Sequence, residues 1–499
     1  LGVLAYCVNP FTLIIICLGS SLSYAIFRYY KFVSRYPKGP FPLPFIDNLD
    51  KMEPRRIDKF FGEFGKTQPP IYTIFMPFPT VQITDYDVLR EAFVEKGNSD
   101  TGNTGTMYNR ITIKFPIFKG VINSNGETWR EQRRAAISIM RDFGMGKNVM
   151  EELVRSSLTD FLQHLDKLPD KSNVDLYWPP VVANVINEIL FGYRYAYDDC
   201  KPLIDYVTRF NELMESVSEN LGIAVGMAVP SLAKLPWIGW HIVGRIKHEM
   251  QTINKYVVDN VGRALKDYGV EDEPTCFVHS YKQRIAMNEH LDDLNLMATC
   301  ADFFIAGQET TSTTLRWAML IMAKHGDVQE KLRSEIHSVV GMDRLPMMAD
   351  QVKMPFARAC ALELQRFANV LGMNVQRVTV NDVTIRDVTI PAGTWVNGDI
   401  HYLMANDPHF VNPQEFRPER YLNDDGVALR RDLVERTLPF SLGKRVCARE
   451  SLARAEIFLG LTAIIQHYRI LLREGEVIDL EPTLVSTFVL PKAQNFRIE

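Results

Sequence analysis

The clearest chemical neighbourhood in this 499-residue chain surrounds Cys447, in the segment FSLGKRVCARE at 440–450. A helical pattern follows at once, so the thiol stands at a helix start. Free backbone N–H groups and the helix dipole there favour the thiolate, the form of cysteine that ligates a metal. Gly443 allows a tight turn, and Arg445 offers a forked cation to a carboxylate. By itself the pattern equally suits a buried cysteine beside a helix cap.

A second group of polar residues lies in FFIAGQETTSTT at 303–314, inside a helix predicted over 291–324. The small residues Ala306 and Gly307 would let a planar group approach the backbone. The Thr310 hydroxyl can bond the carbonyl of residue 306 and open the helix there. Glu309 beside it completes an acid and alcohol pair able to supply protons. A core helix with a polar face is the simpler interpretation of AGxxT alone.

Two further sets of residues have spacings that could fix such a site. Glu363 and Arg366, in ALELQRF, lie on one face of a predicted helix, and Arg420 follows in FRPERYL. Surface pairs of this kind contribute little, whereas a buried pair cannot lose one partner without leaving a charge unpaired. Trp129 and Arg133, in GETWREQRR, lie one turn apart, as an amphipathic basic helix would also have them.

These segments together resemble the cytochrome P450 family over nearly the whole chain. The loop spacing is similar to the ligand loop of that family and implies haem b (heme b) with Cys447 as the axial iron ligand. AGQETT resembles its oxygen-binding motif, which implies Glu309 and Thr310 as the catalytic pair. The ExxR helix with Arg420 implies a structural network that holds the cysteine loop. The other residues that the resemblance assigns to the cofactor are Trp129, Arg133, Ala306, Gly307, Gln376, Phe440, Gly443 and Arg445.

Two positions depart from the family pattern. Arg449 stands two residues after the cysteine, where the family usually has glycine, and its long side chain either crowds the haem face or turns outward. Gln376 stands where many relatives carry a histidine that binds a propionate. Both departures bear on haem occupancy, and they motivate the alternative of a haem-poor pseudoenzyme or lipid-binding membrane protein. A haem-thiolate isomerase that needs no reductase is the other alternative.

Hydrophobic periodicity predicts a mainly α protein with small β-sheets, an α+β class that agrees with the P450 fold. IYTIFM and TVQIT predict a small sheet near the N-terminus, short strands return over 381–396, and a C-terminal hairpin is predicted to turn around Leu490 and Pro491. The longer helices are expected at 151–165, 182–191, 246–268, 291–324, 327–339 and 451–468.

The N-terminal segment is expected to anchor the chain in a membrane. Residues 1–27 carry no charge and are followed by basic residues and a proline-rich stretch, KGPFPLPF. We therefore divide the chain into a transmembrane anchor at 1–28, a linker at 29–45 and a single catalytic domain at 46–499. Basic residues after the span predict a cytosolic domain at the endoplasmic reticulum. The seven cysteines show no paired spacing, which agrees with a reducing compartment.

The resemblance is closest to animal microsomal members and implies a monooxygenase that uses O2, a lipophilic substrate and electrons from an NADPH-dependent flavoprotein reductase, with cytochrome b5 as a further candidate donor. A net charge of −4 and no long basic run exclude a general electrostatic affinity for nucleic acid. Basic residues near the loop, balanced against simple solvation, are candidates for docking the reductase: Arg130, Arg133, Arg134, Lys147, Lys444 and Arg449. Position in the family suggests Phe115, Phe118, Phe303, Val370 and Phe488 for the substrate pocket.

Overall fold

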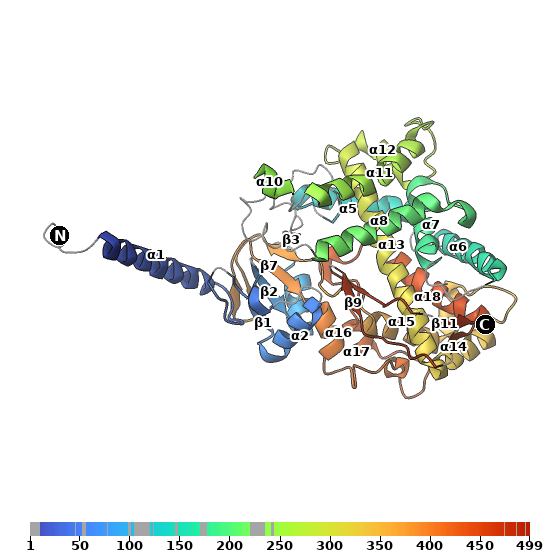
Figure 1. Ribbon diagram of the computed structural model, residues 1–499. Coiled ribbons are helices and arrows are strands. Elements are labelled where there is room, and N and C mark those ends of the chain that lie inside the picture. The colour runs from blue at the N-terminus through green and yellow to red at the C-terminus, as the bar shows by residue number, and fades with distance from the viewer. Residues whose placement is uncertain are drawn as a thin grey trace.

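The computed structural model describes most of the chain, and helix α13 (Asp293–Lys324) runs through its centre (Figure 1). The Asp292 carboxylate caps this helix by accepting from the backbone N–H of Asn295 at 2.6 Å. Most of its side chains are buried, among them a polar set around Gln308 and Glu309, as expected of a helix that crosses the core. The described residues are 10–44, 46–51, 56–76, 78–97, 101–103, 120–122, 124–144, 148–169, 177–219, 235–240, 244–473, 475–485, 487–494 and 496–499.

Helices pack around α13 and form the larger part of the molecule (Figure 1). Its main neighbours are α7 (Trp178–Phe191) and α18 (Glu450–His467), and α18 is likewise buried along its length. The side chains between these helices form the largest hydrophobic cluster. The remaining α-helices of the domain are α2 (Ile57–Thr67), α3 (Tyr86–Arg90), α5 (Gly126–Asp142), α6 (Asn148–Lys167), α8 (Lys201–Glu219), α10 (Pro236–Gly239), α11 (Arg245–Leu265), α12 (Phe277–Ile285), α14 (Gly326–Val339), α15 (Pro355–Phe367), α16 (Ile400–Asn406) and α17 (Arg431–Arg436).

A five-stranded sheet of order β1-β2-β7-β4-β3 lies near the N-terminal helix (Figure 1). Only the pair β2 and β7 is parallel, with Thr80 opposite Trp395. Three separate pairs complete the β structure: β5 with β6, β8 with β11, and β9 with β10. The strands are β1 (Ile71–Phe75), β2 (Pro79–Ile83), β3 (Thr101–Asn103), β4 (Arg377–Thr379), β5 (Val383–Ile385), β6 (Val388–Ile390), β7 (Trp395–Gly398), β8 (Ile470–Leu472), β9 (Thr483–Val485), β10 (Phe488–Leu490) and β11 (Phe496–Ile498).

The predicted class, mainly α with small sheets, is confirmed, but two boundaries were wrong. Helix α7 starts at Trp178 and not at 182, because Pro179 and Pro180 fit the first helical turn, where no N–H partner is needed. The C-terminal hairpin turns between Val485 and Phe488, and Leu490 is the last residue of β10. Pro491 follows the strand and ends it, since proline has no N–H for a ladder.

Helix α1 (Pro10–Val33) projects from the domain on the side of the five-stranded sheet (Figure 1). Its segment Phe11–Val33 is long and apolar enough to cross a membrane, and none of it is buried in the protein. The end of the helix is joined to the start of the domain, because the Tyr29 hydroxyl donates to the Asp47 carboxylate at 2.6 Å. The Tyr30 ring also stacks on Phe41. The helix therefore leaves the domain at a packed joint.

Candidate active site

The cysteine loop is folded by a glycine that no other residue could replace without strain. Gly443 has φ +75°, and a Cβ there would lie 1.9 Å from the carbonyl oxygen of Phe93 in the π-helical turn η4 (Glu91–Glu95). The loop is closed by the N–H of Cys447, which donates to the Phe440 carbonyl at 3.0 Å. Together these contacts set the cysteine just before α18, whose N-cap is Arg449.

Two arginines from distant segments hold the loop through its backbone carbonyls. Arg133 of α5 donates to the carbonyl of Val446 at 2.6 Å. Arg377 at the start of β4 donates to Leu442 at 2.6 Å and lies 3.6 Å above the ring of Phe93. The sequence predicts Arg133 as a propionate contact. The structure shows that it also holds the backbone carbonyl of Val446, the residue before the cysteine.

Cys447 opens into a cavity of about 230 Å³ between the cysteine loop and α13. Part of its wall comes from α13, through Ala306, Gly307 and Thr310. Another part comes from the cysteine loop, through Phe440, Arg445 and Cys447. Segments from four different parts of the sequence thus meet at one space. Its other lining residues include Val121, Asp302, Phe303, Asn369, Val370, Leu371, Asn374 and Ile457.

The thiol of Cys447 has solvent access through this cavity, yet it lies deep among protein atoms. Burial raises its pKa, and the charge of Glu450 acts in the same direction. The backbone N–H of Arg449 lowers the pKa again, as do the charges of Arg449 and Arg133. Cations and an N–H donor therefore surround the sulfur, as a thiolate ligand requires.

The cavity carries an excess of positive charge. Of the described residues that line it, Arg133, Arg377, Arg445 and Arg449 are cationic, and Asp302 is acidic. Burial lowers the pKa of Arg377 and of Arg445 to about 9, and repulsion between these arginines and Arg133 contributes. Cations packed so closely favour an anionic ligand.

Unused donors point to the same ligand chemistry. The buried Nη1 of Arg445 and the buried Nε1 of Trp129 have no hydrogen-bond partner among the described residues. The Arg445 guanidinium lies 3.7 Å above the Trp129 ring, so the two groups share one place. A haem has two carboxylates at one edge and a metal that takes a thiolate. The residues present fit this group.

Within α13, the Thr310 hydroxyl donates to the carbonyl of Ala306 at 2.7 Å. The bond forms as predicted, and α13 remains helical through this turn. Thr310 lines the cavity, whereas Glu309 is buried and accepts from the Thr313 hydroxyl at 3.1 Å. Burial raises the pKa of Glu309, which favours its protonated form. Glu309 is thus the sequence neighbour of a residue that lines the cavity, but it does not line the cavity itself.

Arg449 neither turns outward nor belongs to a surface patch. Its side chain is buried and reaches α13, where Nη1 donates to the carbonyl of Phe303 at 3.1 Å. Arg133 is also committed to the interior. The predicted docking patch is therefore wrong in these two members. Arg130, Arg134 and Lys444 are exposed, and Lys147 lies outside the described residues.

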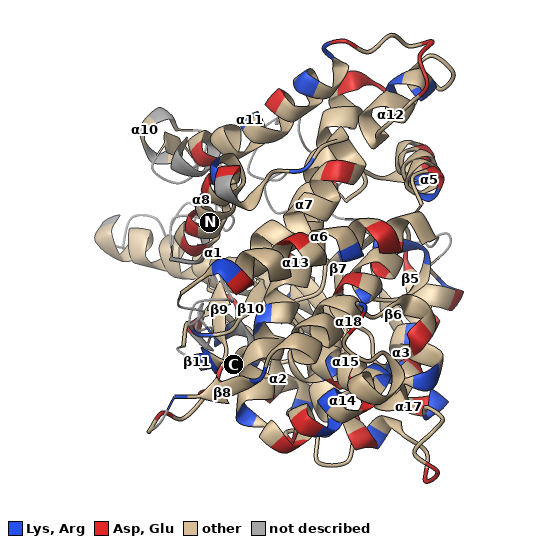
Figure 2. Ribbon diagram, turned by 90° about the vertical axis from the view of Figure 1, so that its right-hand side faces the viewer, with Lys and Arg blue, Asp and Glu red and all other residues tan. Residues whose placement is uncertain are grey.

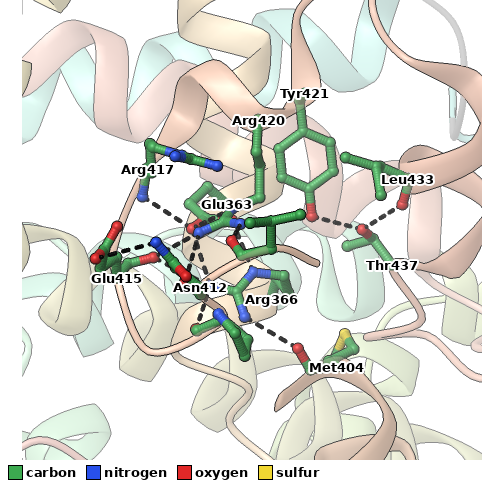
Figure 3. A network of polar contacts seen from close by, with 12 residues as sticks. Glu363, Arg366, Met404, Asn412, Glu415, Arg417, Arg420, Tyr421, Leu433 and Thr437 are labelled. Atoms are coloured by element: carbon green, nitrogen blue, oxygen red, sulfur yellow. Dashed lines mark hydrogen bonds and ion pairs between the residues drawn. The ribbon is translucent and has the colours of Figure 1, made fainter. Parts of the chain in front are cut away.

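Glu363, Arg366 and Arg420 form one buried network between α15 and the 404–420 segment (Figure 3). The Glu363 carboxylate accepts from Arg366 at 2.7 and 2.9 Å and from Arg420 at 3.0 Å. The backbone N–H of Arg417 donates to it at 2.9 Å. The two guanidinium groups bond the carbonyls of Met404, Val411, Asn412, Pro413 and Glu415. Helix α15 is thereby joined to the 404–420 segment.

Asp302 was not predicted from the sequence. One oxygen of its partly buried carboxylate accepts from the backbone N–H groups of Val121 and Ile122 at 2.8 and 2.9 Å. A Cβ on Gly120, at φ +60°, would lie 2.4 Å from the same oxygen. Asp302 therefore holds the segment before α5 against α13. An aspartate one turn before AGQETT is the only local signal, and its partners lie about 180 residues away.

The predicted substrate residues are only partly brought together. Phe303 and Val370 line the cavity. Phe488 forms a β-bridge with Leu371, which lines the cavity, but Phe488 is not itself part of the wall. Phe115 and Phe118 lie outside the described residues. Gln376 is also absent from the described wall, and its Nε2 lies 3.3 Å from the sulfur of Met373.

A cysteine thiol that faces a threonine-bearing helix across a cationic cavity is the arrangement of a haem-thiolate enzyme. A family model described as Cytochrome P450 matches residues 37–496. The chain is 31% identical over 494 residues to Cytochrome P450 2H2 of Gallus gallus, with 97% of each chain covered. It is 32% identical over 474 residues to Cytochrome P450 2E1 of Oryctolagus cuniculus, with 89% of each covered. It is 30% identical over 476 residues to Cytochrome P450 2C8 of Homo sapiens, with 93% of each covered.

The chain therefore belongs to the cytochrome P450 family and is a monooxygenase of that family. The family implies haem as the cofactor, with its iron bound by a cysteine thiolate.

We expect Glu363→Ala to prevent stable folding, because it leaves two buried guanidinium groups without a counter-charge, at a cost of about 3–5 kcal/mol. Thermal unfolding of the full-length protein measures this loss. Glu330→Ala is the matched control, since Glu330 pairs with Arg469 at the surface and its removal should cost under about 1 kcal/mol. Equal losses in the two variants would contradict the role of the buried network.

Asp302 should make stability depend on pH. Burial raises the pKa of its carboxyl to about 7, although the two backbone N–H groups lower it. Between about pH 4 and pH 7 the folded state holds a proton that the unfolded state has released, so the free energy of unfolding falls as pH rises, by up to about 1.4 kcal/mol per unit. Asp302→Asn keeps an oxygen for both N–H donors and should remove this slope. Urea unfolding at several pH values would refute the assignment if both proteins gave the same slope.

Proposed function

We propose that this protein is a membrane-anchored monooxygenase that inserts one atom of O2 into a lipophilic small molecule, with Cys447 as the haem ligand. The observation that carries the proposal is the position of the Cys447 thiol, which opens into the same cavity as Thr310. When bound, the haem supplies the activation of dioxygen. Xenobiotics, steroids and fatty acids are the substrate classes that a largely apolar wall favours.

Different residues around the cavity would bind the haem, supply protons and exclude water. Trp129, Arg133 and Arg445 would hold the haem carboxylates, and Arg377 adds charge beside them. Thr310 keeps a hydroxyl at the cavity through its bond to Ala306, from which it can pass a proton. Glu309 is the nearest acid on the same helix, and its raised pKa favours the protonated state. Phe303 and Val370 exclude water from the reacting centre.

The surroundings of the domain support a membrane-bound enzyme supplied with electrons from outside. Residues 1–28, which include most of helix α1 (Pro10–Val33), would form the membrane anchor, with 29–45 as the linker and 46–499 as the cytosolic catalytic domain at the endoplasmic reticulum. Trp237 and Trp240 of the α10 region are 84% and 65% exposed, as residues that dip into a membrane surface would be.

Electrons would come from NADPH through a flavoprotein reductase, with cytochrome b5 as a further donor. Arg130 and Arg134 are exposed on α5, but each pairs with a glutamate of its own helix. Lys444 belongs to the loop itself and is an exposed cation with no acidic partner among the described residues. In the view of Figure 2, cationic and anionic residues are intermingled over the helices. Docking would therefore depend on a local patch, not on a strongly basic face.

The reduced full-length protein should show a red-shifted absorption band with carbon monoxide, because a thiolate ligand donates electron density to the iron. Cys447→Ala should abolish this band, while Cys276→Ala, at a buried cysteine outside the cavity, should keep it. A wild-type spectrum without any band would contradict the proposal and favour a haem-poor lipid-binding protein. Turnover that needs no NADPH would favour an isomerase.

Thr310→Ala should keep the same absorption band but lower the amount of product formed per NADPH consumed, by about tenfold or more. The alanine removes the hydroxyl that donates to Ala306 and leaves the thiol untouched. Product and NADPH are measured together with a lipophilic substrate and added reductase. Thr314→Ala is the matched control, since its hydroxyl makes the equivalent bond one turn further along. An unchanged ratio in Thr310→Ala would exclude a role for Thr310 in proton supply.

A further inference from the structure

Arg449 is placed where three helices meet. Its Nη1 donates to the Phe303 carbonyl of α13 at 3.1 Å. A Cβ on Gly307 would lie 1.0 Å from this nitrogen, and 2.8 Å from Cδ1 of Ile186 in α7. The guanidinium therefore occupies the space that the missing side chain of Gly307 leaves. An arginine at the N-cap of α18 and a glycine in α13 fit only as a pair.

A buried carboxyl group lies on the helix that Arg449 caps. Glu456 of α18 is 3% exposed. Burial raises the pKa of Glu456 to about 8, and the Arg449 charge opposes this rise. Glu456 is therefore mostly protonated near neutral pH, and the contact that holds the Arg449 guanidinium is the Phe303 carbonyl.

The same cation also acts on the cysteine. Arg449 follows Cys447 by two residues, and the two groups interact electrostatically. The guanidinium of Arg449 thus contacts α13, while its backbone lies two residues from the cysteine. A rigid link between these two walls fixes how far the thiol stands from the turn that carries Gly307 and Thr310.

We propose that Arg449 is a positioning residue that ties the cysteine loop to α13, with its guanidinium packed on Gly307 and bonded to the Phe303 carbonyl. The position that most family members fill with glycine is therefore used here for an added cation. The link is a property of the polypeptide, and only its effect on the haem rests on the proposed function.

The packing of Arg449 on Gly307 is tested by a double-mutant cycle on the full-length protein. Gly307→Ala should lower the Tm by about 4 °C or more, because its methyl group would overlap Nη1 of Arg449. In Arg449→Gly the same change should lower the Tm by less, since only the contact with Cδ1 of Ile186 at 2.8 Å remains. Gly262→Ala, at a helical glycine in open space, is the matched control and should not lower the Tm. Equal losses from Gly307→Ala in both backgrounds would overturn the proposal.

The bond to α13 is tested by a second pair of variants. Arg449→Met keeps the stem but removes the N–H that donates to the Phe303 carbonyl, so it should lower the Tm. Arg449→Lys keeps a donor and should lose less. Equal losses in the two variants, or no loss in either, would overturn the bond as the link.

The effect on the haem is measured by its reduction potential, which a purely structural role would not change. Removal of a buried cation near the ligand disfavours the reduced iron, so Arg449→Met should make the potential more negative, and Arg449→Lys should keep it near the wild-type value. An unchanged potential in Arg449→Met would overturn the positioning role. If the wild-type protein bound no haem, the proposed function would fail, while both Tm experiments would still test the link.

Discussion

The position of one thiol is the constraint on which the rest of this structure depends. Cys447 lies in a loop whose regular structure, among the described residues, is the short 3-10 turn η11 (Gly443–Arg445), and such a loop alone would not hold a sulfur atom at a fixed place. The structure fixes it through the backbone: Gly443 packs against η4, Arg377 bonds Leu442, and Arg133 bonds Val446. These contacts come from three distant parts of the chain. The geometry of the site is thus a product of the whole fold.

Two groups of charged residues, one compensated and one not, affect the stability of this structure in different ways. Between α15 and the 404–420 segment, Glu363 is fully compensated by two arginines and an N–H group, so the network stabilises the fold without taking part in the reaction. At the cavity, Arg377 and Arg445 lie close together with lowered pKa values and an unused donor. Such an uncompensated cluster costs stability unless an anion binds. Cofactor binding and folding are therefore expected to stabilise each other.

The sequence was informative wherever the chemistry is local. Helix α13, the cysteine loop and the pair Glu363 and Arg366 follow from periodicity and short spacings, and the resemblance adds Arg420. Local patterns also indicated the short strands, although the last hairpin was placed too late because Pro491 resembles a turn residue. Residues three or seven positions apart lie on the same face of a helix, which is why the helical features could be predicted from spacing.

Contacts between distant segments could not be predicted in this way. Asp302 is an ordinary helical residue until the fold brings the N–H groups of Val121 and Ile122 to it. The direction of Arg449 depends on the free volume over Gly307, which no pattern records. The exposed patch was wrong for a similar reason, because Arg133 found a carbonyl partner inside.

X-ray absorption at the iron edge of the purified full-length protein tests the central claim most directly, since it reports which atoms bind the metal. One sulfur neighbour in the wild-type protein, absent in Cys447→Ala, is the result we predict. A metal surrounded only by nitrogen and oxygen, or a sulfur neighbour that persists without Cys447, would contradict it.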